Sequence, residues 1–341
     1  MGHRTMIEGR AITFRCRLTS PFHTARQTYA NLAKCAPFIL GSTIRGAVLK
    51  YLIEAHCPKD KIVALRQLND PQQVTAYHLA CDLDCPARPF FQHREHIWFT
   101  CALLNEERFG SVTRIALSRR TASVAEGGIF NVEIATPGTD FAFEVFLLGP
   151  AQELVDTVED AVRAVGCWSG LGGHRSVGFG RFELLGQPQV DEFDDRITKE
   201  LLSWRQSNPS PTLVFLTPLV LGEEVGLETL TGERLAAWLA TEIQRTVSQV
   251  SGDEPDPLPI ERVDFRLKPE FVGRFSYERG LRENRLVAWQ GSQMTLHPRN
   301  GARLDSEQLA IAAVLGIGEW NRWGFGRFRL RQGAPQGNPR S

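Results

Sequence analysis

The first half of the chain carries strand-like and helical patterns in alternation. Apolar and polar residues alternate from Ala11 to Leu18, which predicts a half-buried strand. Apolar residues recur at helical spacing beyond Ser42, so the pattern predicts a helix with Ser42 or Thr43 as its N-cap. Later patterns predict strands at Gly128–Ala135 and Asp140–Leu148 and a helix at Ala151–Val165.

The second half follows the same plan more loosely. An apolar strand is predicted at Leu213–Thr217, and helices are predicted at Glu233–Val250 and Ser306–Leu315. Strand-like segments lie between the two helices, around Val263–Leu267, Phe271–Ser276 and Ser292–Leu296. The length of 341 residues also suits two domains, since a domain holds about 150 residues on average.

A change of composition separates the two halves. An acidic patch begins at Asp191, and the run Ser207-Asn208-Pro209-Ser210-Pro211 ends the segment. We therefore expect an N-terminal domain at 1–190, a linker at 191–211, a C-terminal domain at 212–331 and a flexible tail at 332–341. Residues 57–110 show little periodicity, so we expect an irregular insertion there.

Cysteines and histidines gather in that expected insertion. Cys81 and Cys85 have a spacing allowed for zinc, and Cys57 and Cys101 could complete a four-thiolate structural site. His78 or His93 is an alternative ligand. The simpler interpretation is that these are buried thiols, which behave as small hydrophobic side chains. We favour zinc, because an irregular segment without a core of its own often needs a metal.

Charge and composition exclude some classes of protein. The net charge is zero, which excludes a protein that coats nucleic acid by bulk charge. Of the 39 basic residues 33 are Arg, which suits phosphates and base edges, although a GC-rich genome explains the bias as well. No apolar stretch is long enough to span a membrane. Seven cysteines and the lack of a signal-peptide pattern predict a cytoplasmic protein.

One segment of the second half is strongly basic. From Arg262 to Arg303, nine basic residues stand against four acidic ones, a net charge of +5, with Phe275, Tyr277 and Trp289 interleaved. Arg beside aromatic rings suits an RNA strand, and it is equally typical of a protein–protein contact. The sequence leaves both alternatives open.

An internal repeat is the strongest signal. Residues 170–182 and 316–328 both read Gly-x-Gly, a polar stretch with Arg, and then Gly-Phe-Gly-Arg-Phe. A glycine-rich turn lets backbone N–H groups approach phosphate oxygens, and neighbouring Arg and aromatic side chains add charge and a stacking surface. One such loop is usually only a tight turn, but two matching copies indicate more than that.

The chain resembles the RAMP superfamily (repeat-associated mysterious proteins), the RNA-binding subunits of CRISPR effector complexes. The glycine-rich loop of that family has the pattern of residues 170–182 and 316–328. Further segments are similar to its motifs, in order: Leu40-Gly41-Ser42-Thr43-Ile44-Arg45-Gly46-Ala47, Arg108-Phe109-Gly110-Ser111, Ser118-Arg119-Arg120-Thr121, Gly128–Glu133 and Pro137–Phe141. The resemblance implies an α+β fold with two ferredoxin-like (RRM-like) domains.

The same resemblance implies a function. We expect a non-catalytic subunit of a type III effector complex, most like the type III-D form, that holds the 5′ tag of the guide RNA and helps assemble the complex for antiviral defence. Its expected partners are guide CRISPR RNA, other RAMP subunits and the large subunit, with target RNA nearby. Type III relatives also carry zinc in the region of the insertion.

The resemblance also assigns candidate RNA-binding residues. They come from the loop after the first strand, the segment that opens the first helix, and the two glycine loops. The set is His23, Arg26, Ser42, Thr43, Arg45, Gly172, Gly173, His174, Arg175, Phe179, Arg181, Arg322, Trp323, Phe325 and Arg327.

Catalysis is not expected. Backbone subunits of type III complexes cut target RNA with an Asp in the loop between the first strand and the first helix, and Ser20–Ala36 contains no Asp or Glu. The alternative is an endoribonuclease that processes guide RNA or cuts target RNA, with His23 or His174 as general base. We disfavour it because the sequence shows no partner His or Lys beside either residue. A third interpretation is a scaffold whose glycine loops only make turns.

Overall fold

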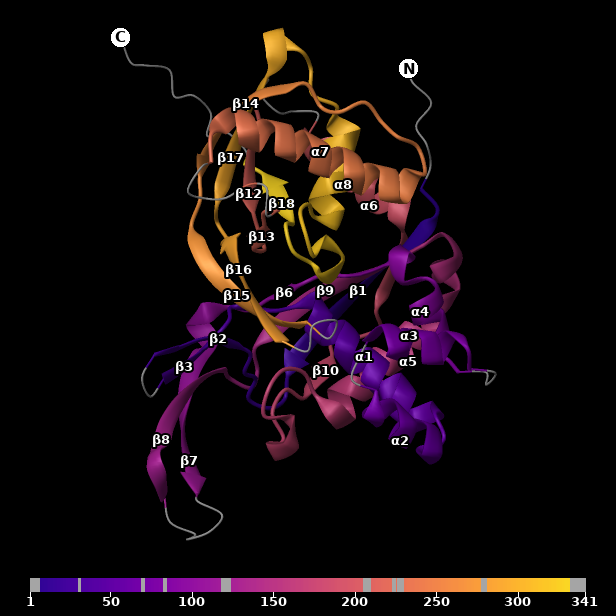
Figure 1. The fold of residues 1–341 in the computed structure, drawn as a ribbon, viewed down its shortest axis with the longest axis vertical. Coiled ribbons are helices and arrows are strands. Elements are labelled where there is room, and N and C mark those ends of the chain that lie inside the picture. The colour runs from indigo at the N-terminus through magenta and orange to yellow at the C-terminus, as the bar shows by residue number, and fades with distance from the viewer. Residues whose placement is uncertain are drawn as a thin grey trace. The chain divides into compact units, whose positions relative to one another are not determined.

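The computed structural model describes residues 7–29, 32–68, 71–81, 85–117, 124–204, 210–222, 225, 230–276 and 281–331 (Figure 1). The chain divides into two compact units, which are described separately. The N-terminal unit comprises Ile12–Val190 and Gly273–Glu283. The C-terminal unit comprises Met1–Ala11, Asp191–Val272 and Asn284–Ser341.

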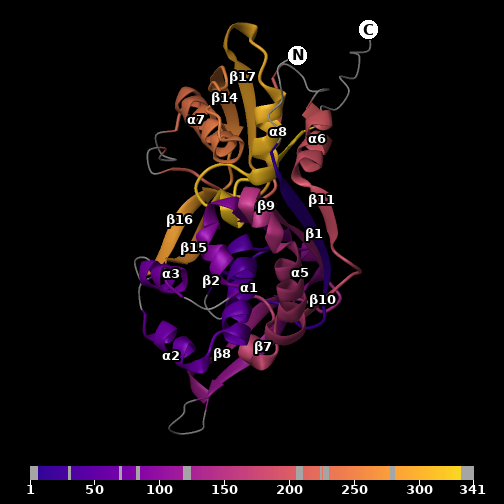
Figure 2. The ribbon, with the colours of Figure 1, turned by 90° about the vertical axis from the view of Figure 1, so that its right-hand side faces the viewer.

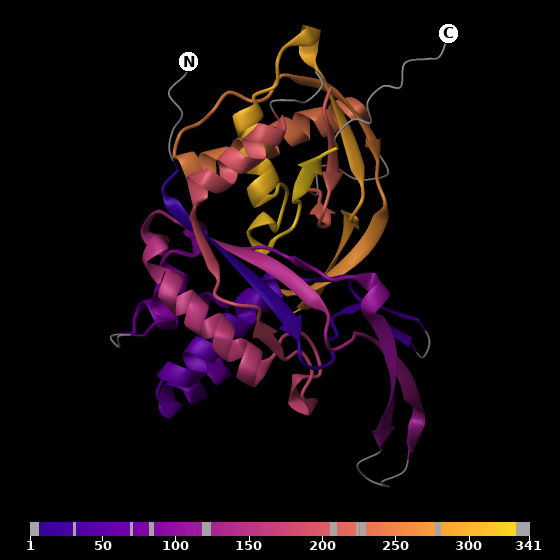
Figure 3. The same ribbon diagram turned by 180° about the vertical axis from the view of Figure 1, so that it is seen from behind.

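A four-strand path forms the centre of the N-terminal unit. Its order is β10 (Phe182–Leu184), β1 (Gly9–Leu18), β9 (Asp140–Leu148) and β5 (Ile97–Phe99), and β11 (Gln189–Glu192) also pairs with β1. Figure 3 shows β1 and β9 side by side. Burial alternates along β1, so the predicted half-buried strand is confirmed. The predicted strand at Asp140–Leu148 coincides with β9.

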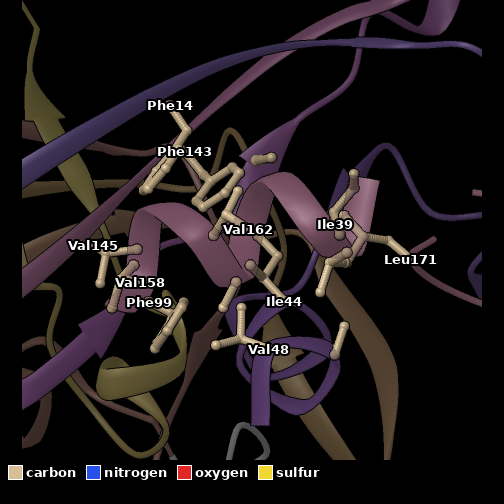
Figure 4. Packing of buried hydrophobic residues seen from close by; sticks show 14 of the residues in the cluster. Phe14, Ile39, Ile44, Val48, Phe99, Phe143, Val145, Val158, Val162 and Leu171 are labelled. Atoms are coloured by element: carbon tan, nitrogen blue, oxygen red, sulfur yellow. The ribbon is translucent and has the colours of Figure 1, made fainter. Parts of the chain in front are cut away.

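Two helices bury their apolar faces against this sheet. They are α1 (Gly41–His56) and α5 (Val155–Ala164), which lie beside each other (Figure 2). Ile44 and Val48 of α1 and Val158 and Val162 of α5 are buried with Phe14, Phe99, Phe143 and Val145 of the strands (Figure 4). The rings of Phe14 and Phe143 stack with centroids 4.9 Å apart. Each fully buried aliphatic side chain stabilises the unit by about 2 kcal/mol.

The start of α1 differs from the prediction. Neither Ser42 nor Thr43 is the N-cap, because the helix already begins at Gly41 and Leu40 occupies the cap position. No side chain caps this end, and the backbone N–H of Thr43 donates to the carbonyl of Leu40 at 2.9 Å. Ser42 and Thr43 therefore lie in the first turn of the helix.

Residues 57–110 are not irregular. They contain α2 (Lys59–Gln67), α3 (Pro71–Leu79), α4 (Arg88–Gln92), β5 and β6 (Ala102–Leu103). The helices have five to nine residues, too few turns for a periodic pattern to emerge from the sequence. Strand β5 is an edge of the central sheet, so this segment includes part of the domain core.

A second sheet in this unit has the order β2 (Ala25–Tyr29), β3 (Leu32–Cys35), β8 (Val124–Ala135) and β7 (Phe109–Leu117). Strands β7 and β8 form a long antiparallel hairpin. Short β4 (Phe38–Ile39) pairs with β6. The family-like segment Ser118–Thr121 lies outside the described residues.

The C-terminal unit has a sheet of order β14 (Ile260–Arg266), β17 (Gln293–Pro298), β12 (Thr212–Phe215) and β18 (Phe328–Leu330). Helix α8 (Ser306–Leu315) lies between α7 (Gly232–Ser251) and α6 (Phe193–Trp204) (Figure 2), and its residues from Gln308 to Leu315 are buried. Side chains cap α7 and α8: Thr231 accepts from the Arg234 N–H, and Asp305 from the Glu307 N–H. A third sheet has the order β13 (Leu219–Val220), β16 (Leu281–Ala288) and β15 (Pro269–Ser276).

The two units share one order of elements. In each, strand, helix, strand, strand, helix and strand follow one another, and the strand order in space is fourth, first, third, second. Along the chain, a pair of strands also separates the second and third strands of each set, β7–β8 in one and β15–β16 in the other. The repeat seen in two short loops of the sequence therefore extends to the topology of both units.

The remaining elements of the described residues are short helical turns of three to six residues. The 3₁₀ turns are Arg94–His96, Glu106–Arg108, Gly149–Leu154, Arg175–Val177, Arg299–Gly301 and Asn321–Trp323, and Val165–Ser169 is a π-helical turn. Among the described residues, no helix has the length and apolar character needed to cross a bilayer. The expected tail at 332–341 lies outside the described residues.

Candidate nucleic-acid interface

The first glycine loop, residues 170–180, has a backbone that only glycine allows at key positions. Gly180 has a φ of +80°, and a Cβ there would lie 1.9 Å from the carbonyl oxygen of Leu171. A Cβ on Gly172 would lie 2.5 Å from the carbonyl oxygen of His23. The spacing of glycines in the motif is therefore a requirement of the backbone.

This loop is held by the segment that follows β1. The N–H of Gly180 donates to the Pro21 carbonyl at 2.7 Å, and the N–H of Gly173 donates to the His23 carbonyl at 2.8 Å. The N–H of Arg181 donates to Oγ of Ser20 at 2.8 Å. These hydrogen bonds fix the loop to the segment that follows the first strand.

The second loop, residues 316–326, repeats these contacts. The N–H of Gly326 donates to the Pro218 carbonyl at 2.8 Å, and the N–H of Arg327 donates to Oγ1 of Thr217 at 3.0 Å. His174 and Trp320, at matching positions, both adopt left-handed backbone angles, with φ of 57° and 66°. The two loops have one backbone design.

Their side chains differ. In the first loop the ring of His174 lies 5.5 Å from that of His23, centroid to centroid, and 5.7 Å from that of Phe179, edge on. The guanidinium carbon of Arg114, from β7, lies 5.8 Å from the centre of the Phe179 ring. His174, Arg175 and Phe179 are half-buried and Gly173 is exposed. A polar, cationic and aromatic cluster therefore surrounds the first loop.

The two histidines of this cluster are held in a weakly basic state. Burial lowers the pKa of His23, and burial together with the charge of Arg114 lowers the pKa of His174. Nδ1 of His23 lies 2.8 Å from the carbonyl oxygen of Glu133, which can only accept, so Nδ1 carries the proton in the neutral ring. The lone pair of His23 is then on Nε2.

The second loop is closed instead of open. Asn321 is buried, and its amide donates to the Gly316 carbonyl at 3.3 Å and to Oγ1 of Thr246 at 3.4 Å. Arg245 donates to the Gly318 carbonyl at 3.1 Å. Phe325, a candidate RNA-binding residue, is only 2% exposed, and its ring packs in the core.

The other expected RNA-binding residues lie at several places. Arg45 is half-buried on α1 and donates to the Phe90 carbonyl at 3.5 Å. Arg26 on β2 is half-buried, and Arg181 is exposed. In the C-terminal unit Arg322, Trp323 and Arg327 are half-buried. Among the candidates outside the two loops, His23 lies directly against the first glycine loop.

Sequence reasoning missed two contributors to the cluster, Arg114 and the backbone carbonyl of Glu133. Both lie on the β7–β8 hairpin, and Phe22 forms a β-bridge with Ala135 at its end. Sequence reasoning also missed that His23 and His174 lie beside each other, so that each is the partner histidine not visible in the sequence near the other. These residues are 151 positions apart in sequence, so no local pattern shows their contact.

The expected zinc ligands are partly together. Sγ of Cys57 lies 3.8 Å from Sγ of Cys85, and Nζ of Lys61 lies 3.7 Å from Sγ of Cys81. Burial and the neighbouring Cys85 and Cys81 raise the pKa of Cys57 to about 11. Cys101 is buried between β5 and β6. Within the described ranges, no three His, Cys, Asp or Glu side chains are arranged to hold a metal ion.

Fold and site together define a repeated α+β protein with a glycine-rich loop in each repeat. Residues 15–183, just under half of the chain, match the family model of the RAMP superfamily. A search of the curated proteins finds no match.

Solved structures give a wider set of matches, 226 chains in all. One is a chain from the "Cryo-EM structure of the Type III-B Cmr-beta bound to cognate target RNA", with 16% identity and a TM-score of 0.37. The match covers 54% of the present chain and 61% of that one, so the similarity spans less than two thirds of the matched chain.

Proposed function

We propose that this protein is a non-catalytic RNA-binding subunit of a type III CRISPR effector complex, and that both units are ferredoxin-like RAMP domains. The shared strand order and the inserted hairpin of each unit support the second part. In the complex, the protein holds the 5′ tag of the guide RNA, most like the subunit of type III-D systems. Other RAMP subunits and the large subunit are its partners.

The open first glycine loop carries this proposal. Its backbone is fixed to Ser20–His23, so an RNA strand meets a surface that needs little ordering on binding. Arg175 and Arg114 supply charge for phosphates, and the Phe179 ring, beside Arg114 and His174, supplies a face for a base. This combination suits single-stranded RNA better than a duplex.

The first test is the nucleic acid that copurifies with the protein. We expect a high ratio of absorbance at 260 nm to that at 280 nm, and a population of short RNAs with a common 5′ sequence. RNA without a common 5′ sequence would contradict the 5′-tag role. The absence of nucleic acid, together with no binding of added guide RNA, would favour the scaffold interpretation.

One observation favours a second candidate function, metal-independent cleavage of RNA. His23 and His174 lie together, and Nε2 of His23 could take the proton of a ribose 2′-OH. The 2′-oxygen would then attack phosphorus while the bond to the 5′-oxygen breaks, and protonated His174 would give that oxygen its proton. The products would be a 2′,3′-cyclic phosphate and a 5′-OH end.

We rank cleavage second because His23 is only 5% exposed, and a base must reach its substrate within hydrogen-bond distance. Incubation of the protein with repeat RNA in EDTA tests it. We expect no specific cleavage. Cleavage at one site that is lost in both His23→Asn and His174→Asn would establish the nuclease instead.

We also propose that a structural zinc ion is held by Cys57, Cys81, Cys85 and a fourth ligand. A Zn–S distance of about 2.3 Å in a tetrahedron corresponds to about 3.8 Å between sulfurs, the separation of Cys57 and Cys85. Cys101 is the expected fourth ligand. His78 is the alternative: it is 1% exposed, and its Nε2 has no hydrogen-bond partner among the described residues. A bound zinc would fix the end of α1 to the start of α4.

Elemental analysis of gently purified protein tests this site. We expect about one zinc per chain, lost in Cys57→Ser and Cys85→Ser and kept in Cys167→Ser, an exposed cysteine elsewhere. Separate Cys101→Ser and His78→Ala variants identify the fourth ligand. Metal-free wild-type protein would leave these residues as ordinary buried thiols.

A further inference from the structure

A tryptophan stands out of the N-terminal unit just before the first glycine loop. Trp168 is 78% exposed, the largest exposed fraction among the exposed large hydrophobic side chains of the described residues. It lies in the π-helical turn Val165–Ser169, which continues α5. The turn is closed by a hydrogen bond of 2.7 Å from the N–H of Gly170 to the carbonyl of Val165, five residues back. π-helical turns are rare and often mark functional positions.

The second copy of the repeat has no π-helical turn before its glycine loop. There the N–H of Gly316 donates to the carbonyl of Ala312, four residues back, at 2.8 Å, so α8 runs into the loop without a π turn. Val314 matches Trp168 in the alignment of the repeats and is only 1% exposed. The wider turn of the first copy thus coincides with a large side chain in solvent.

The π turn is fixed to the sheet. A Cβ on Gly166 would lie 2.5 Å from the Phe182 carbonyl oxygen of β10, so only glycine allows this close approach. The position of Trp168 is therefore set by the packing of its own turn.

The exposed surface of α5 leading to Trp168 is acidic. Asp156, Asp160, Ala164 and Trp168 are spaced four residues apart, so they form one row along the helix. Both aspartates are exposed. Glu159 lies beside them: burial, and then the charge of Asp156, raises its pKa, with a further contribution from Asp160.

We propose that Trp168 and the row Asp156–Asp160 of α5 form a docking surface for a neighbouring protein subunit that presents basic side chains around an apolar pocket. The proposal rests on the function proposed above, since it places the partner among the other subunits of the effector complex. Trp is among the residues that contribute most to protein interfaces when a pocket of the partner encloses it. The two carboxylates select a basic rim and orient the partner.

The charge decides between a protein and RNA as the occupant. RNA phosphates on this side of α5 would meet the carboxylates of Asp156, Asp160 and Glu159, and Arg163 is the only basic residue between Ala151 and Ser169. The indole of Trp168 could stack on a base, but the carboxylates would still repel the phosphates of the RNA backbone. A basic protein surface has no such conflict.

The test uses the effector complex formed by coexpressing this chain with the other protein subunits and guide RNA of its own locus. Dissociation on dilution is followed by native mass spectrometry. We expect Trp168→Ala to raise the concentration of half-dissociation at least about tenfold. Asp156→Lys with Asp160→Lys should act in the same direction, and Trp168→Phe should recover part of the loss. Leu202→Ala, which truncates another exposed apolar side chain, serves as the matched control.

The outcomes separate the two proposals. If the wild-type chain does not enter the complex, the proposed function is overturned and the docking proposal with it. If Trp168→Ala dissociates like wild type, the docking proposal alone is overturned. It is also overturned if Trp168→Ala weakens guide-RNA binding by the isolated chain, which would make RNA the occupant, or abolishes a dimer of the isolated chain, which would make a second copy the occupant.

Discussion

The two glycine loops have the same backbone and differ in how deeply some of their side chains are buried. Both are fixed to a Ser/Thr-Pro pair after the first strand of their unit, and both carry a left-handed residue at the same position. In one, His174, Arg175 and Phe179 remain half-buried around an exposed turn; in the other, Asn321 and Phe325 are buried. The shared backbone is a requirement of the turn itself, while several matching side chains are more exposed in the first loop than in the second.

The largest expected effect tests the shared backbone. Gly180→Ala and Gly326→Ala each place a Cβ 1.9 Å from a carbonyl oxygen, of Leu171 and Ile317 respectively. We expect each to lower the free energy of unfolding by about 3 kcal/mol or more. Urea titration of each variant measures the loss.

Gly178→Ala is the matched control for these variants. Gly178 has a φ of +86°, but no atom lies within 4 Å of the added Cβ. Backbone strain alone should then cost about 1 kcal/mol. Equal losses for Gly178→Ala and Gly180→Ala would contradict the argument that close contact, and not only the positive φ, requires glycine in the loop.

The second prediction separates the closed loop from the open one. Asn321→Ala removes the donor to the Gly316 carbonyl and to Oγ1 of Thr246, so the free energy of unfolding should fall by about 1–3 kcal/mol. Arg175→Ala, at the matching position, should change it by no more than about 0.5 kcal/mol. Thermal or urea unfolding compares the two. A stable Asn321→Ala protein would show that the second loop is not held by its own polar contacts.

The third prediction concerns RNA affinity. Arg175→Ala should weaken binding of tagged guide RNA about fivefold and reduce the slope of log affinity against log salt by about 1, because one phosphate contact is lost. Arg322→Ala in the second loop should leave both quantities close to wild type. Fluorescence anisotropy at several salt concentrations measures them. Equal losses from both variants would mean that both loops hold RNA.

Much of the fold could be predicted from local pattern. The predicted strand at Asp140–Leu148 and the helix at Ser306–Leu315 coincide with β9 and α8, because long amphipathic or apolar runs leave one choice of element. The cap of α1 was misplaced because Ser and Thr are frequent caps but also tolerate the first turn. Short helices such as α2 and α4 gave no period to detect.

The candidate site was only half predictable. Gly172 and Gly180 indicate a tight loop whatever its surroundings in the fold, so the glycine motif could be predicted from the sequence alone. The cluster of His23, His174 and Arg114 joins three distant segments, and the burial of Phe325 depends on helices around it. The sequences of the two loops are alike at Phe179 and Phe325, yet burial differs, since burial is a property of tertiary packing.

The smallest expected effect is a pH dependence confined to the first loop. The pKa of His23 and that of His174 are lowered in the folded chain, so the unfolded chain binds protons more readily as pH falls through the ordinary histidine value of about 6.5. Stability should therefore decrease as pH falls through that range, and His23→Asn and His174→Asn should each flatten the decrease; Asn tolerates the left-handed backbone of His174.

Bound RNA should oppose the effect, because phosphates favour the protonated rings, so guide affinity should rise from about pH 8 to about pH 6 and rise less in either variant. In the second repeat, Val220 and Trp320 occupy the positions that match His23 and His174. Trp320 variants should therefore leave the pH dependence of stability and of guide affinity unchanged. A wild-type chain whose guide affinity does not change with pH, beside an unchanged His174→Asn variant, would remove the histidine pair from the RNA surface and leave Arg114, Arg175 and Phe179 as its chemistry.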